Sequence, residues 1–353
     1  MFQLNKIVKF LLGLGILTLG GFLLLQVPSV QDRLLENAIP NLVQDNMPKE
    51  DALSAIVCGS RSPLPHSSRD EACILVIAGK NIYVIDTGAG SANNVNQWAI
   101  PANRIKAVLL THLHSDHIAD LPNFHMSTWI NNRPSQLDVY GPEGLESVVQ
   151  GFEDAYSLDY AFRNAHHGDA IAPLTVAGMK AHTIDLNNPV IIESDDLSIQ
   201  AFEVEHHPVK PALGYRFDYK GRSIVISGDT SASQNLTDHS RNADVLFHEA
   251  QANHILKPLR QFMLENDRTN QAKILDDITT YHTTPVEAAA IAKEANVKHL
   301  FFYHLTPSPR NDIMAKIFTR GVSDVFEEWT LSDDGTMVVL PVNSEEIQIS
   351  NLN

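Results

Sequence analysis

The 353-residue chain has few cysteines, few basic residues and no internal repeat. Cys58 and Cys73 are its only cysteines, and without a Cys-x-x-Cys pair neither a thiolate zinc site nor dithiol redox chemistry is expected. The 26 lysines and arginines stand against 42 acidic residues and leave a net charge of −16. Because this field repels phosphate backbones, nucleic acid is a disfavoured partner.

The N-terminus departs from a globular composition. Lys6 and Lys9 precede an almost uninterrupted apolar run from Phe10 to Val27. A run of about 18–20 apolar positions can cross a bilayer, and no A-x-A cleavage site follows it. We therefore expect residues 1–27 to be a membrane anchor or uncleaved signal, with the catalytic domain exported to a periplasmic or extracellular location. Secretion after signal cleavage is the alternative.

The remaining chain divides into a linker and one hydrolase-sized domain. Residues 28–52 are polar and mildly helical, and the globular part is expected to occupy residues 53–353. Both cysteines flank predicted strands in that domain. Either a Cys58–Cys73 disulfide or two reduced core thiols fits this placement.

Strand patterns dominate the globular part, with helical patterns between them. Strands are expected at 54–57, 73–78, 81–86, 106–110, 137–140, 197–205, 214–219, 223–227, 244–248 and 298–303. Helices are expected at 143–156 and 285–295, whereas the segment 157–181 has an irregular pattern. Two groups of strands with helices between them predict an α/β sandwich, in which two sheets are covered outside by helices.

The segment Thr111–His117 concentrates metal-binding side chains directly behind a short apolar strand. Side chains alternate in an extended segment, so His112 and His114 point the same way and can hold one ion together. Asp116 and His117 come after the turn, which suits a second ion. A chance cluster is disfavoured, because burying these groups without a partner would cost desolvation energy.

Three later strands also end in candidate ligands. His206 and His304 come directly after predicted strands, and Asp229 follows another with only Gly228 between. Catalytic groups gather where strands stop and loops begin. We therefore expect these three residues to meet the cluster at one site.

These motifs together resemble the metallo-β-lactamase superfamily of binuclear hydrolases. The resemblance rests on His-x-His-x-Asp-His at 112–117, Gly-Asp-Thr at 228–230 and a late histidine at 304, and it extends over residues 54–341. Tyr-Gly-Pro at 140–142 and Gly-Tyr-Arg at 214–216 are similar to the ribonuclease Z and arylsulfatase-like branch. The fold that this implies is a four-layer αββα sandwich.

The resemblance implies two divalent metal ions held by seven residues. One ion is assigned to His112, His114, His206 and Asp229, and the other to Asp116, His117, Asp229 and His304. A carboxylate can bridge two cations, while neutral imidazoles complete each shell. Zinc is the expected metal, and Mn²⁺ or Fe²⁺ is the alternative, because mixed nitrogen and oxygen sites bind several divalent ions.

The implied chemistry is ester hydrolysis by a hydroxide that bridges the two ions. Asp116, His282 and Glu249 are the expected catalytic residues. His282 would donate a proton to the leaving group and Glu249 would orient it. The structural alternative for His282 is a capping residue ahead of the helix that starts at Pro285.

A missing insertion guides the choice of substrate. Ribonuclease Z enzymes carry a long arm that clasps transfer RNA, whereas a short span with a hairpin pattern joins His206 to Asp229 here. We therefore expect a small anionic ester, either a phosphodiester or a sulfate ester, with Arg61 and the pair His166–His167 as candidates to bind its charge. The alternatives are a ribonuclease Z-type tRNA 3′ endonuclease, a lactone hydrolase or a catalytically silent metal-binding protein.

Overall fold

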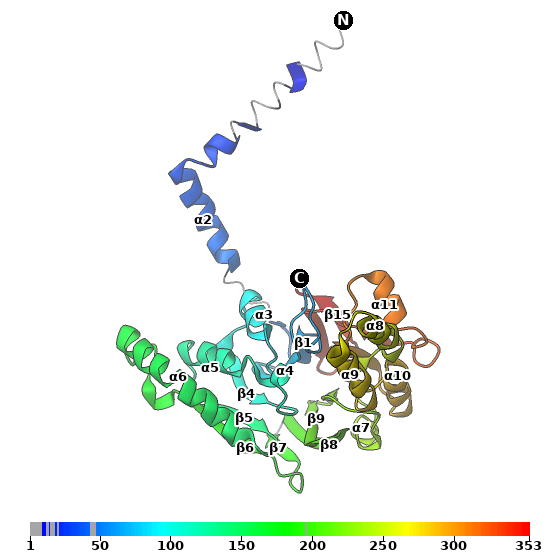
Figure 1. Cartoon of the computed structure of the whole chain (residues 1–353). Helices are drawn as coiled ribbons and strands as arrows, with labels where there is room; N and C mark the ends of the chain where they lie inside the picture. Colours follow the sequence, from blue (N-terminus) through cyan, green and yellow to red (C-terminus); the bar gives the residue numbers. More distant parts are fainter. Residues whose placement is uncertain (1–8, 12–13, 15–17, 20, 43–46, 195) are drawn as a thin grey trace, which may run out of the picture. The chain divides into compact units, whose positions relative to one another are not determined.

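The computed structural model describes residues 9–11, 14, 18–19, 21–42, 47–194 and 196–353 (Figure 1). Contacts within the chain divide it into two units, residues 1–46 and residues 47–353. The described part of the first unit includes helix α2 (Pro28–Leu42), in agreement with the helical pattern of that segment. The second unit contains both sheets and all seven expected ligands.

The prediction of a membrane-spanning helix needs correction. Part of the predicted span lies outside the described residues, at positions 1–8, 12–13, 15–17 and 20. Among the residues that the structure describes, no helix is both long enough and apolar enough to cross a bilayer. The expected membrane partner and the exported location of the catalytic domain depended on that helix, and both expectations are withdrawn on this finding.

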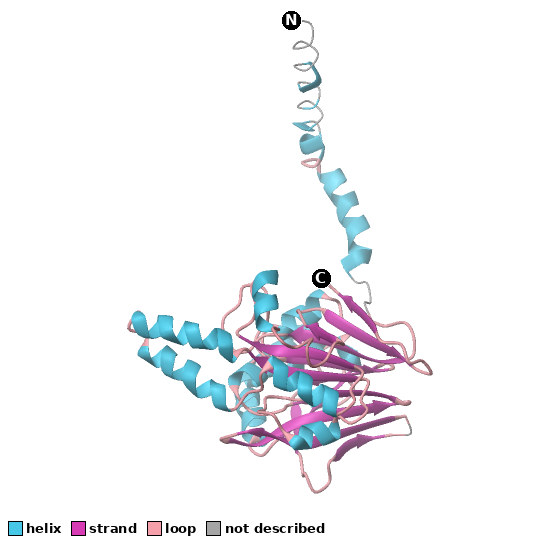
Figure 2. Ribbon diagram, turned by 90° about the vertical axis from the view of Figure 1, so that its right-hand side faces the viewer, coloured by secondary structure: helices cyan, strands magenta, loops and turns pink. Residues whose placement is uncertain are grey.

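Two sheets packed face to face form the centre of the second unit (Figure 2). The first sheet has the order β15-β14-β1-β2-β3-β4-β5-β6 and the second has the order β13-β12-β11-β10-β9-β8-β7. The first sheet consists of β1 (Ala52–Gly59), β2 (Cys73–Ala78), β3 (Asn81–Ile85), β4 (Ile105–Leu109), β5 (Leu137–Gly141), β6 (Met179–Thr183), β14 (Thr336–Pro341) and β15 (Gln348–Asn351). The second consists of β7 (Val190–Glu193), β8 (Leu197–His206), β9 (Val209–Tyr219), β10 (Arg222–Ile226), β11 (Val245–Gln251), β12 (His299–Thr306) and β13 (Trp329–Leu331).

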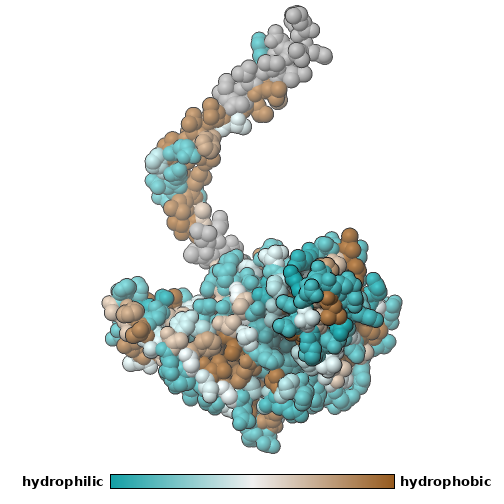
Figure 3. Space-filling view, in the orientation of Figure 1, coloured by the Kyte–Doolittle hydropathy of each residue, from teal (hydrophilic) through white to brown (hydrophobic). Residues whose placement is uncertain are grey.

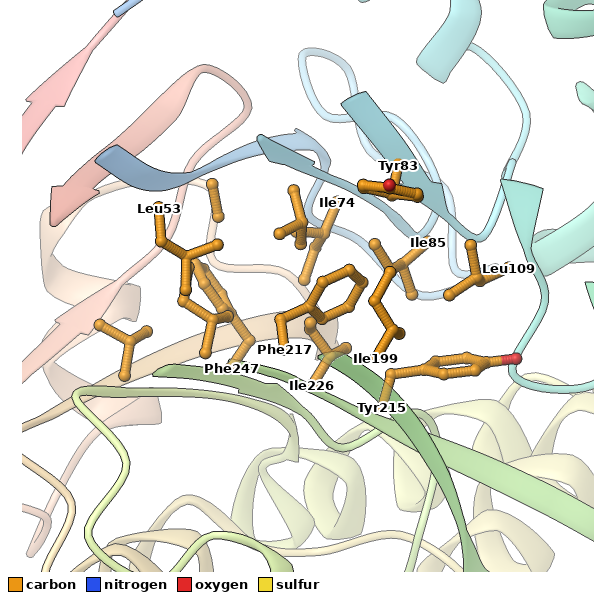
Figure 4. Close-up of a cluster of buried hydrophobic side chains, with 14 of the residues drawn as sticks. Leu53, Ile74, Tyr83, Ile85, Leu109, Ile199, Tyr215, Phe217, Ile226 and Phe247 are labelled. Atoms are coloured by element: carbon orange, nitrogen blue, oxygen red, sulfur yellow. The ribbon is translucent and has the colours of Figure 1, made fainter. Parts of the chain in front are cut away.

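Apolar side chains from the two sheets meet between them (Figure 4). Leu53 and Ile74 come from the first sheet, and Phe217 and Phe247 come from the second. All four are almost completely buried. Because each buried square ångström of apolar surface contributes about 25 cal/mol, this interface is the main force that holds the sheets together.

Helices cover the outer faces of both sheets. The outer cluster of the first sheet includes side chains of α3 (Ser91–Gln97), α5 (Leu121–Ile130) and α6 (Leu145–His167). The outer cluster of the second includes side chains of α7 (Gln234–His239), α8 (Asn253–Glu265), α10 (Pro285–Glu294) and α11 (Asp312–Phe318). The predicted αββα sandwich is therefore confirmed.

Two helical regions differ from the predicted secondary structure. Helix α6 continues to His167 through the segment expected to be irregular, and α8 together with α9 (Thr269–Asp277) occupies a segment for which no element was predicted. The later part of α6 leaves Leu158 and Phe162 exposed. Its apolar residues do not follow one buried face, and for that reason the helical period was hard to recognise.

The two cysteines form a disulfide between β1 and β2. Cys58 and Cys73 are both fully buried and are separated by 15 positions. The bond closes the loop that contains Arg61, next to the edge of the sheet where the candidate ligands lie.

Replacing both Cys58 and Cys73 with alanine should lower the free energy of unfolding by about 3 kcal/mol, because a loop of this length gains chain entropy in the unfolded state. Urea denaturation of the variant and of the wild type would measure the difference. Wild-type protein treated with a reductant is the control, since it loses the bond and keeps both sulfur atoms. Equal stability of all three proteins would contradict the prediction.

Candidate metal centre

The histidine cluster lies where β4 ends at one edge of the first sheet. His112 and His114 occupy the loop after this strand, and Asp116 and His117 lie in the short helix α4 (Ser115–Ile118). His112 Nε2 lies 2.9 Å from His114 Nδ1, so the two rings present nitrogen atoms to the same point. Asp116 and His117 follow the turn into α4, yet the ring centroids of His117 and His112 lie only 4.0 Å apart, so the predicted division into two ligand sets stays a prediction.

The carboxylate of Asp86 fixes the conformation of this loop. Its carboxylate accepts hydrogen bonds from the backbone N–H and the hydroxyl of Thr111, both at 2.8 Å, and lies 2.8 Å from His117 Nδ1. A hydrogen bond at Nδ1 leaves Nε2 of His117 free for the centre. From the sequence, Asp86 was predicted only to end the strand 81–86. One signal could have identified it: Asp86 is an acidic residue directly after the buried strand β3, and β3 pairs with β4, the strand before the histidine cluster.

The second sheet supplies His206 at the end of β8 and Asp229 just after β10. The Nδ1 of His206 lies 3.1 Å from the Tyr281 carbonyl oxygen, which leaves Nε2 for the centre. Only glycine fits at position 228, directly before Asp229, because a Cβ there would lie 2.4 Å from the Leu213 carbonyl oxygen. The φ of +62° at this position also favours glycine.

His304 enters the centre through an irregularity in β12. The register of β11 and β12 shifts where Glu249 pairs with Tyr303 and Ala250 pairs with Leu305, so His304 is an extra residue. Its φ of +45° departs from the strand conformation. Such a bulge changes the direction of a side chain. Here the Nε2 atom of His304 lies 3.2 Å from the carboxylate of Asp116 and 3.4 Å from that of Asp229.

The seven expected ligands come together in overlapping groups of three whose ligand atoms lie within 4.8 Å of one another. Those groups are His112, His114 and His206; His112, His117 and Asp229; and Asp116, His117 and His304. The Oδ2 atom of Asp229 lies 3.5 Å from His117 Nε2 and 3.4 Å from His304 Nε2. The cluster is therefore able to bind divalent metal ions.

Unpartnered polar atoms support the same conclusion. His117 Nε2 and Asp229 Oδ1 are buried and have no hydrogen-bond partner. Burying such atoms without a partner costs several kcal/mol as a rule, and a cation would satisfy both. Nitrogen and oxygen donors in this mixture fit zinc, manganese or iron(II). The residues present thus fit the expected group, while the assignment of each ligand to one ion stays a prediction.

The protonation of Asp116 and His112 suits cation binding. Burial favours the neutral carboxyl of Asp116, but the neighbouring His117 and His304 outweigh it and lower its pKa to about 2. Burial lowers the pKa of His112 well below its usual value, and His117 adds to this effect. A charged carboxylate and a neutral imidazole are the forms that coordinate metals. Burial opposes a charge on His117, but the carboxylates of Asp229, Asp86 and Asp116 outweigh burial and raise the pKa of His117 well above its usual value, so this ring would release a proton when a cation binds.

His282 and Glu249 form a pair beside the seven ligands. His282 Nδ1 lies 2.8 Å from Glu249 Oε1, and the same oxygen accepts the backbone N–H of Thr283 at 3.1 Å. Burial opposes a charge on His282, but the carboxylate of Glu249 outweighs burial and raises the pKa of His282 to about 9. The carboxylates of Asp229 and Asp116 add to this rise, which favours the protonated imidazole at neutral pH.

A cavity of about 310 Å³ gives access to these groups. Its lining includes His114, Asp116, His206, Asp229, His282 and His304. Arg61 does not line it and instead forms an ion pair of 3.0 Å with Glu71. His166 and His167 are exposed at the end of α6, so the three residues considered for binding the anionic group lie outside this cavity.

Comparison with known proteins places the chain in a family. The family described as "Beta-lactamase superfamily domain" matches residues 81–305. Ribonuclease Z from Mycolicibacterium gilvum is 31% identical over 259 residues, covering 72% of this chain and 85% of the relative. Ribonuclease Z from Mycobacterium marinum is 32% identical over 253 residues, covering 71% of this chain and 85% of the relative.

Solved structures share the fold. The metallo-β-lactamase fold protein YhfI from Bacillus subtilis matches with a TM-score of 0.59 at 20% identity, covering 82% of this chain and 99% of the other. The short form of human tRNase Z matches with a TM-score of 0.58 at 20% identity, with the same coverage.

The ribonuclease Z relatives correct one expectation from the sequence. Nucleic acid was disfavoured as a partner because of the net charge of −16, yet proteins named for a ribonuclease activity match most of this chain. Net charge describes the whole surface and says little about one site, so that exclusion was wrong. The chain belongs to the β-lactamase superfamily of metal-dependent hydrolases, and ribonuclease Z proteins are its relatives there.

Proposed function

We propose that this chain is a metal-dependent phosphodiesterase that cleaves RNA as a ribonuclease Z-type tRNA 3′ endonuclease. The observation that carries the proposal is one cavity lined by five of the seven expected ligands and by His282, whose Nδ1 contacts Glu249. The ribonuclease Z relatives support RNA as the substrate class, because the matched region covers 85% of the length of each relative. Zinc is the proposed metal.

The ligand residues hold and orient the reacting groups. Two bound divalent ions would supply an activated water and neutralise the charge that develops on the phosphate. Asp86 orients His117 and the Tyr281 carbonyl orients His206, so both rings keep their Nε2 atoms free for the metal ions. Asp229 is proposed to bridge the two ions, because its carboxylate neighbours histidines of both predicted sets.

His282 is proposed to protonate the leaving oxygen. Glu249 occupies Nδ1, and Nε2 is the ring nitrogen left for the substrate. The raised pKa keeps a proton available there at neutral pH. Proton transfer from a positioned side chain contributes typically about 10²- to 10⁴-fold to such a reaction.

A small phosphodiester or sulfate ester is the second candidate substrate. Strands β9 and β10 fill almost the whole span between His206 and Asp229, and Lys220 and Gly221 form the turn between them. This span therefore adds no separate arm that could clasp a large RNA. The observation favours a substrate that fits inside the cavity.

Zinc-loaded protein should cleave a precursor tRNA with a 3′ trailer and should also hydrolyse bis(p-nitrophenyl) phosphate. Both activities should disappear with a chelator and return with added zinc. Cleavage of the phosphodiester alone would favour the second candidate. Turnover of p-nitrophenyl sulfate alone, or of none of the three compounds, would refute the phosphodiesterase proposal.

Asp229→Ala should lose both metal ions, since one side chain is proposed to serve each of them. Metal analysis of the purified protein would count the ions that remain. Asp154→Ala is the matched control, because Asp154 is an exposed aspartate on α6. Retention of two equivalents by Asp229→Ala would contradict the bridging role.

His282→Ala should slow the hydrolysis of esters with poorly acidic leaving groups by about 10²- to 10⁴-fold. Esters of p-nitrophenol should be affected much less, because p-nitrophenolate departs without a proton. Rate measurements on a matched series of leaving groups would test this, with the exposed His166→Ala as control. An equal loss across the series would show that His282 does not donate the proton.

A further inference from the structure

A second and larger cavity adjoins the metal centre. It has a volume of about 800 Å³ and is lined by helices α8, α9 and α11, by residues 64–65 and by the loop before α11. These helices lie together in Figure 1. Leu64 and Ile274 line both this cavity and the metal-centre cavity, so the two spaces are adjacent at these side chains.

The walls of the second cavity are mainly aliphatic. Ile255 and Leu259 line it from α8, Ile274 and Leu275 line it from α9, and Met314 lines it from α11. None of the lining residues is aromatic, so the cavity offers no ring on which a nucleobase could stack. Figure 3 shows apolar side chains within the otherwise hydrophilic surface of this region.

Ile274 lies where the two cavities adjoin. It is 55% exposed although it is a large aliphatic residue, and it contributes to both linings. Leaving such a side chain in water forfeits burial energy that a bound apolar group would recover. Arg268 and Arg310 also line the larger cavity, and their positive charge favours substrates with an anionic group nearby.

We propose that this second cavity is an apolar subsite of the metal centre, which gives the enzyme a further substrate class: small phosphodiesters carrying an alkyl or aryl group. The scissile phosphate occupies the metal-centre cavity, and its apolar substituent passes Leu64 and Ile274 into the larger space. This inference rests on the proposed phosphodiesterase activity. The adjacency of the two cavities selects the occupant, since a group attached to the scissile phosphate would lie next to the larger space.

The test uses the zinc-loaded full chain and p-nitrophenyl phosphodiesters whose second group is methyl, butyl or hexyl. The leaving group is identical throughout, so differences report binding of the second group. KM should fall about two- to fourfold for each added methylene, as expected for burial of an alkyl chain. Thymidine 5′-(p-nitrophenyl) phosphate tests a nucleoside in the same position.

Met263→Asp should abolish the dependence of KM on chain length, because it places a charge in the wall of the cavity. Phe262→Asp is the matched control on the same helix. Phe262 is 54% exposed and does not line the cavity, so this variant should keep the wild-type dependence. Equal effects of the two variants, or a KM that does not change with chain length, would overturn the subsite. A thymidine ester that gains as much as the hexyl ester, and loses that gain in Met263→Asp, would make the cavity a nucleoside site and would also overturn it.

Binding separates the subsite from the catalytic proposal. Calorimetric titration with methyl-, butyl- and octylphosphonate should give a Kd that falls with chain length in wild type and in Phe262→Asp, and stays constant in Met263→Asp. This pattern without any phosphodiester hydrolysis would refute the proposed function and support the subsite. Hydrolysis of all the esters with a Kd independent of chain length would refute the subsite alone.

Discussion

The candidate metal centre depends on the contacts of the Asp86 carboxylate with Thr111 and His117. Asp86 is almost completely buried, and its backbone has a φ of +57°. Its carboxylate accepts hydrogen bonds from the loop that carries the histidine cluster. A buried carboxylate is costly unless it is fully hydrogen-bonded, so the loop is held in the conformation that supplies those donors. That conformation also aims Nε2 of His117 at the centre.

The same loop is tied to the opposite sheet. The hydroxyl of Tyr215, which points out of the apolar cluster in Figure 4, donates to the Leu110 carbonyl oxygen at 2.6 Å. Four of the expected ligands follow β4, whereas His206, Asp229 and His304 belong to the second sheet. The separation of the two ligand groups is therefore set by the packing of the sheets. Apolar burial between the sheets thus stabilises the fold and fixes the geometry of the centre together.

The proposed apolar subsite is formed by elements outside the two sheets. Helices α8 and α9 join β11, which carries Glu249, to the segment that carries His282. They also form much of the wall of the larger cavity. A rigid core with variable connections at the strand ends is a common way to keep a reaction and change its substrate. The relatives therefore inform the chemistry of the centre more strongly than they inform the group proposed to enter the second cavity.

The sequence was sufficient to predict the sandwich, the histidine cluster and the three distant ligand candidates. Their signals are local, because strands alternate with a period of two and ligands follow strand ends. Asp86, the Tyr281 carbonyl and the disulfide became clear only in the structure, since each acts through a partner that is remote in sequence. The bulge at His304 likewise depends on the register between β11 and β12.

Two predictions from the sequence were wrong. The net charge of −16 is summed over the whole chain and does not describe the surface around one site. The apolar N-terminal run forms, within its described residues, no helix long and apolar enough to cross a bilayer. The amino-acid sequence by itself determined which groups can bind metal and where the strands end. Only the tertiary structure decided which of those groups meet and what space lies beside them, because both depend on the packing of sheets and helices that are distant along the chain.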